Sequence, residues 1–66
     1  MNQIQLNGEP RLVQAVTILA LVEELSLDPR KVAVERNLEI MPKSLHASTP
    51  VAPGDRIELV QFVGGG

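Results

Sequence analysis

The sequence predicts an α+β fold in which one helix packs across a mixed sheet of four to five strands. Three observations support this prediction. Apolar and polar residues alternate from Asn2 to Leu6, apolar residues recur with helical spacing from Ile18 to Leu25, and a second alternating run extends from Arg56 to Val63. A short helix between strand-forming segments is unstable alone and must bury its apolar stripe against a sheet.

Size and composition limit the possible functions. The chain has 66 residues, which suits one domain that buries only about 60% of its unfolded surface. It contains no cysteine, and its net charge of -2 provides no basic surface for nucleic acid. No apolar run approaches the roughly 20 residues that span a bilayer, and no signal-peptide pattern is present. We therefore expect a cytoplasmic protein that binds neither nucleic acid nor membrane.

The first half of the chain predicts a hairpin followed by the helix. Asn7-Gly8 favours a tight turn between a strand at Asn2–Leu6 and a returning strand at Arg11–Val13, with Pro10 at the strand start or edge. Thr17 is the expected N-cap of the helix. Glu23 and Glu24 are expected on its solvated face, and Pro29 prevents its continuation. The apolar stripe comprises Ile18, Leu21, Val22 and Leu25.

The second half predicts three more strands. Val32–Glu35 and Glu39–Met41 are expected to form a hairpin. A two-residue turn would force Leu38 to a positive φ, so we expect a loop one residue longer. Residues 43–49 suggest an irregular segment or one 3₁₀ turn, and residues 53–55 a turn before the last strand. The first and last strands are then central neighbours, which is the β-grasp arrangement.

The sequence offers little for catalysis. His46 is the single histidine, and with no cysteine and no paired carboxylates nearby it is expected to be a partly packed or exposed loop residue. Ser44, Ser48 and Thr49 have no neighbouring base. We therefore expect that the chain is not an enzyme and holds no metal.

The last strand presents a candidate contact surface. If Ile57 and Leu59 face the helix, Val60 and Phe62 lie on the opposite face of the sheet, where exposed apolar residues usually mark a contact site. The alternative is that the strand twists and Phe62 folds back onto the sheet edge. Exposure is favoured because little core remains near that end.

The final residues predict a reactive chain end. We expect a domain at residues 1–63 and a flexible tail at residues 64–66, in which the glycines contribute no stability but can thread a narrow cleft. An α-carboxylate is ionised at neutral pH and is a poor electrophile, so it reacts only after activation, for example as an acyl-adenylate made from ATP. The alternatives are a disordered end or a cloning remnant.

Short motifs distributed over almost the whole chain form a recognisable pattern. They are Asn7-Gly8-Glu9-Pro10, Thr17 with Leu21-Val22-Glu23-Glu24-Leu25, Leu27-Asp28-Pro29-Arg30, Val32-Ala33-Val34-Glu35 with Asn37, Ile40 with Pro42-Lys43-Ser44, Pro50-Val51, the run from Gly54 to Val60, and Val63-Gly64-Gly65-Gly66. Together these motifs resemble the ThiS family, the ubiquitin-like sulfur carriers of thiamine biosynthesis. The chain departs from the family pattern at Leu38 and Ser26, where glycine is frequent, and in the segment from Arg11 to Val16, which is about one residue short.

The resemblance implies a specific chemistry at Gly66. An E1-like enzyme of the ThiF type would use ATP to adenylate its carboxylate, and sulfur from a cysteine desulfurase would convert it to a thiocarboxylate. A thiazole synthase of the ThiG type would accept that sulfur. The carrier itself would bind no cofactor. Partner binding would involve Val60, Phe62, Val63, Gly64 and Gly65.

Two alternatives remain open at the level of sequence. A sulfur carrier for molybdopterin synthesis or tRNA thiolation would use the same chemistry at Gly66. A β-grasp binding module would use the fold and leave the tail inert.

Overall fold

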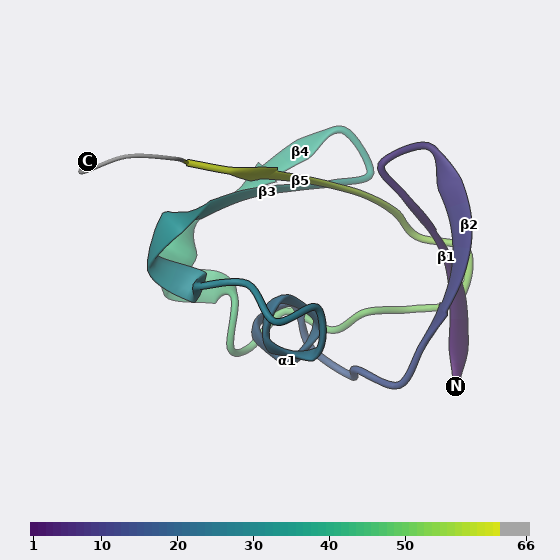
Figure 1. Cartoon of the computed structure of the whole chain (residues 1–66). Coiled ribbons are helices and arrows are strands. Elements are labelled where there is room, and N and C mark those ends of the chain that lie inside the picture. Colours follow the sequence, from purple (N-terminus) through teal and green to yellow (C-terminus); the bar gives the residue numbers. More distant parts are fainter. Residues whose placement is uncertain (63–66) are drawn as a thin grey trace.

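The computed structural model describes residues 1–62 as a five-stranded mixed sheet curved over one helix (Figure 1). The strand order is β2-β1-β5-β3-β4, with β1 and β5 parallel and the other pairs antiparallel. The strands are β1 (Asn2–Leu6), β2 (Glu9–Val13), β3 (Val32–Arg36), β4 (Glu39–Met41) and β5 (Arg56–Gln61). This confirms the α+β prediction, with the first and last strands as neighbours.

The helix α1 (Ile18–Glu24) begins at the residue that the sequence predicts. Thr17 caps it through its side-chain oxygen, which accepts a hydrogen bond from the backbone N–H of Ala20 at 3.1 Å. Two 3₁₀ turns, η1 (Pro29–Lys31) and η2 (Lys43–Leu45), complete the elements of the described residues. Glu24 differs from the prediction of a purely solvated side chain, because its carboxylate accepts hydrogen bonds from the backbone N–H groups of Gln14 and Ala15.

The core lies between the helix and the concave face of the sheet. Alternation in the strands and helical spacing in α1 direct one set of apolar side chains into this space, as the sequence predicts. Removing them from water is the main favourable contribution to folding in a domain without disulfides. The buried apolar residues are Ile4, Val13, Ala15, Ile18, Leu21, Val22, Val32, Val34, Val51 and Ile57.

The β3–β4 loop contradicts the sequence expectation. Arg36 pairs with Glu39, so the turn has two residues rather than three, and both Asn37 (φ 51°) and Leu38 (φ 71°) adopt left-handed conformations. The ladder fixes the register of both strands, which forces Leu38 into a conformation that its side chain disfavours. The strand β2 also begins earlier than expected, at Glu9, and tolerates Pro10 because it is an edge strand.

Candidate functional site

The central strand β5 separates its side chains between the two faces of the sheet. Ile57 is buried and Leu59 packs against the core, whereas Val60 and Phe62 are 59% and 53% exposed. This confirms their predicted exposure on the side away from the helix. The alternative in which Phe62 returns to cover the sheet edge is not observed. Two apolar side chains near the end of β5 are therefore available for contact.

The position of Phe62 is fixed by the backbone. Gln61 pairs with Val32 at the end of β5, and the N–H of Phe62 donates a 2.7 Å hydrogen bond to the carbonyl of Lys31. The predicted site residues Val63, Gly64, Gly65 and Gly66 lie outside the described residues, as does the predicted domain boundary after residue 63. The fold thus holds the chain in a defined position up to the residue before these four.

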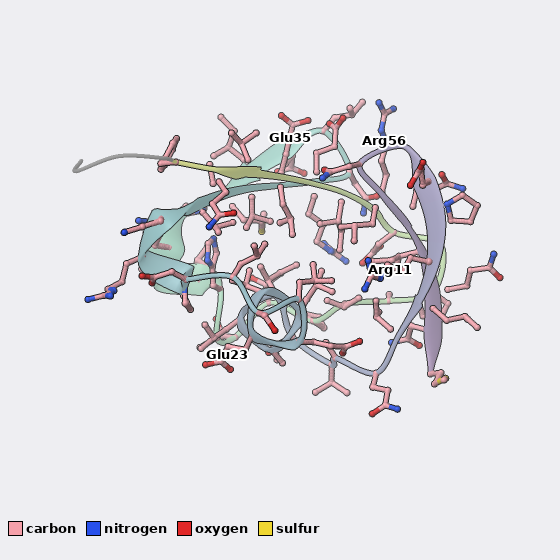
Figure 2. All side chains as sticks on the ribbon, in the orientation of Figure 1. Arg11, Glu23, Glu35 and Arg56 are labelled. Carbon is pink, nitrogen blue, oxygen red and sulfur yellow. The ribbon has the colours of Figure 1, made fainter. Side chains whose placement is uncertain are left out.

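A groove on the outer face of the sheet lies beside Val60. It has a volume of about 450 Å³ and is lined by Asn7, Ala33, Val34, Glu35, Ile40, Glu58, Leu59 and Val60. Ile40 is 78% exposed in this groove, more than Val60. Figure 2 shows Glu35 on this face and Glu23 beyond the helix. Sequence reasoning missed Ala33, Ile40 and the two glutamates, although alternation within the predicted hairpin could have assigned them to this face.

Asp55 is a buried carboxylate whose partners all belong to the fold. Its oxygens accept hydrogen bonds from the backbone N–H of Ala52 (2.8 Å), the side-chain amide of Asn37 (3.1 Å) and Nε of Arg36 (3.0 Å). Burial opposes ionisation, but these three donors outweigh it and hold the pKa of Asp55 below its ordinary value. Asp55 therefore orders the turn before β5.

His46 has a packing role. It is only 3% exposed, so it is buried more fully than the expected loop residue, and its Nε2 lies 2.9 Å from the carbonyl oxygen of Met41. Within the part of the chain that the structure describes, no three His, Asp or Glu side chains gather as metal ligands. None of the helices found in residues 1–62 has the length and apolar character to cross a membrane.

The fold and the exposed end of β5 define a ubiquitin-like β-grasp protein whose last strand runs toward the glycines of the sequence. The chain belongs to the ThiS family, whose model matches residues 4–66. It is 33% identical over 63 residues to the sulfur carrier protein ThiS of Thermus thermophilus, covering 96% of this chain and 98% of that protein.

Two further similarities extend this result. The crystal structure of a thiamine biosynthesis protein (ThiS) from Geobacter metallireducens superposes with a TM-score of 0.82 at 29% identity, covering 97% of this chain and 99% of that one. A thiazole synthase of Paramagnetospirillum magneticum is 54% identical over 65 residues. That match covers 97% of this chain but only 20% of the synthase, so the chain spans a fifth of that relative's length.

Proposed function

We propose that this chain is a sulfur carrier of thiamine biosynthesis and that its reactive group is the α-carboxylate of Gly66. The observation that carries this proposal is the match to the ThiS family, which extends through Gly66. The relatives named ThiS favour thiamine biosynthesis over molybdopterin synthesis and tRNA thiolation. The role is that of a carrier, which presents a group to enzymes and does not itself catalyse its conversion.

The proposed reaction begins with activation, because a carboxylate resists attack by nucleophiles. A carboxylate oxygen of Gly66 attacks the α-phosphorus of ATP on an E1-like enzyme of the ThiF type, and pyrophosphate leaves. The outer sulfur of a persulfide made by a cysteine desulfurase then attacks the carbonyl carbon and displaces AMP. A thiol reductant cleaves the sulfur–sulfur bond of the resulting acyl persulfide and is itself oxidised to a disulfide. The product is a thiocarboxylate, and the fold contributes only the docking surface to which the partners bind.

Val60 and Phe62 are proposed to be part of that docking surface. Covalent geometry allows the four residues after Phe62 to extend at most about 14 Å, so a partner acting on Gly66 must bind close to the end of β5. Glycines at positions 64 and 65 admit close approach by a partner's backbone. The thiazole synthase relative supports a ThiG-type enzyme as the sulfur acceptor, because a segment similar to this chain is part of a protein with that name.

The test is the intact mass after incubation with ATP, the E1-like enzyme and a sulfur source. A carrier gains the mass difference between sulfur and oxygen, and the gain maps to Gly66. A variant without Gly65 and Gly66 should stay folded and gain nothing. An unchanged mass with an enzyme that modifies another ThiS protein would reject the proposal. Full partner affinity and function without the two glycines would instead identify a binding module.

A further inference from the structure

The groove on the outer face is built from three strands whose register is known. Glu35 of β3 lies opposite Glu58 of β5 on one side and opposite Ile40 of β4 on the other. Two residues away along the same two strands, and on the same face, Ala33 lies opposite Val60. Directly paired residues share a face with their Cβ atoms about 5 Å apart. The sheet therefore presents two adjacent carboxylates with apolar side chains on either side.

Within residues 1–62, the two negative charges are compensated only in part. No salt bridge of these residues involves Glu35, and Glu58 has only Arg56, whose Nη2 lies 3.9 Å from its Oε1. Figure 2 shows Arg56 on the same face as Glu35. Like charges placed directly opposite each other destabilise a sheet. Two like charges therefore lie directly opposite each other within the lining of the groove, and Arg56 offsets them only in part.

We propose that this groove binds an arginine side chain of the partner that adenylates Gly66. In the partner, that arginine would be flanked by apolar residues. The planar guanidinium donates in a fixed fork that can bridge two carboxylates, and an ammonium group cannot match that geometry. Its aliphatic stem would pack on Ile40 and Val60. This inference rests on the proposed function and specifies which chemistry of the partner recognises the sheet.

The groove is continuous with the contact surface already described. Val60 lines the groove and is exposed on the same face of β5 as Phe62, which stands two positions before the first tail glycine in the sequence. A partner that holds Phe62 while acting on Gly66 therefore also covers the groove. Desolvation by that partner would strengthen the attraction between the carboxylates and a guanidinium.

The experiment measures steady-state adenylation by the E1-like enzyme as a function of carrier concentration. The variants are Glu35→Gln, Glu58→Gln and the double variant, with Glu23→Gln on the helix as the matched control. We expect the double variant to raise KM at least tenfold with little change in kcat, because the groove contributes binding that is equal in the ground and transition states. The control should behave as the unsubstituted chain. Higher salt should raise KM less for the double variant.

Stability distinguishes recognition from a structural role. Removing one charge of the pair should leave the thermal midpoint unchanged or raise it, so binding and stability should change in opposite directions. The arginine is identified by a double-mutant cycle, in which its replacement by alanine has no further effect when Glu35→Gln and Glu58→Gln are both present.

Three results would overturn the inference. An unchanged KM in the double variant, while the unsubstituted chain is adenylated normally, rejects the groove and leaves the proposed function intact. A fall in the thermal midpoint that accounts for the lost activity makes the pair structural. Self-association of the chain that the double variant abolishes assigns the groove to a second copy. Failure of the unsubstituted chain to be adenylated rejects the proposed function itself.

Discussion

The side-chain oxygen of Asn7 accepts a 2.8 Å hydrogen bond from the backbone N–H of Leu59, which is 52 residues further along the chain. The backbone N–H of Asn7 also donates to the carbonyl of Ile57 at 2.9 Å. The β1–β5 pairing itself extends only to Leu6 and Ile57. Asn7 therefore continues the ladder beyond the end of β1 by using its side chain as a substitute for a strand residue.

Asn37 makes the equivalent contact from the other side of β5. Its N–H donates to the carbonyl of Arg56 at 2.7 Å, and its side-chain oxygen accepts from the N–H of Arg56 at 2.9 Å. Both asparagines occupy left-handed positions in two-residue hairpin turns. The strand that carries the candidate docking surface is thus held in position from both hairpins.

Substitutions of Asn7 separate its left-handed turn conformation from its hydrogen bond to Leu59. Asn7→Gly keeps the left-handed conformation but removes the acceptor for Leu59, so it should lower the free energy of unfolding by about 1 kcal/mol. Asn7→Asp is the control, because it keeps an acceptor oxygen and tolerates the same conformation. Denaturant unfolding measures the stability, and hydrogen exchange at the Leu59 amide reports the local contact. Equal protection of that amide in both variants would contradict this role.

Leu38 offers a stabilising substitution. A left-handed conformation costs an L-residue roughly 1–2 kcal/mol, and this side chain is 69% exposed, so little apolar burial is lost with it. Leu38→Gly should therefore raise the free energy of unfolding by about 0.5–1 kcal/mol. Leu12→Gly is the control, because Leu12 is similarly exposed in β2 and its replacement should destabilise the strand. A loss of stability in Leu38→Gly would show that the exposed leucine packs favourably.

The elements of this fold could be predicted from sequence because they depend on local patterns. Alternation identified the strands, helical spacing identified α1, and Thr17 marked its start. The contacts that position β5 could not be predicted in the same way. Nothing near Asn7 indicates that its side chain meets Leu59, and nothing near Glu35 indicates that Glu58 lies opposite.

The candidate site likewise has one part that local patterns predict and one part that depends on long-range contacts. Exposure of Val60 and Phe62 follows from alternation in one strand, so the sequence predicts it. The groove depends on the register of three strands, which is set by long-range pairing. Leu38 was mispredicted for a related reason: its local preference is overruled by the ladder between Arg36 and Glu39. The reactive role of Gly66 came from the family resemblance and stays a prediction.

Asp55 should make stability depend on pH at the acidic end. Its pKa is lowered in the fold, so its contribution is complete above the unfolded value of about 3.9 and is lost as the pH falls through the folded value. Asp55→Asn should cost about 2–3 kcal/mol at pH 7, because charge-assisted hydrogen bonds are lost from a buried group.

The Asp55→Asn variant and the unsubstituted chain should differ less in unfolding free energy as the pH falls below about 4. Unfolding free energies measured from pH 7 to pH 2 test this. Asp28→Asn is the matched control. The exposed pair with Arg30 lowers the pKa of Asp28 to about 2, but solvent screens that pair. The control should therefore lose little stability at pH 7. A pH-independent difference for Asp55→Asn would show that the carboxylate charge is not the stabilising feature.

Phe62→Ala should weaken docking far more than it weakens the fold. More than half of this side chain is exposed, so its removal uncovers little core, whereas an aromatic residue at the centre of an interface can account for a tenfold or greater change in affinity. Leu12→Ala is the control, with 60% exposure on the distant edge strand β2. Calorimetric binding to the adenylating partner and thermal unfolding measure the two effects. Because the N–H of Phe62 donates to Lys31 through the backbone, alanine keeps that anchor. A large drop in the thermal midpoint with normal docking would place Phe62 in the packed core and remove it from the docking surface.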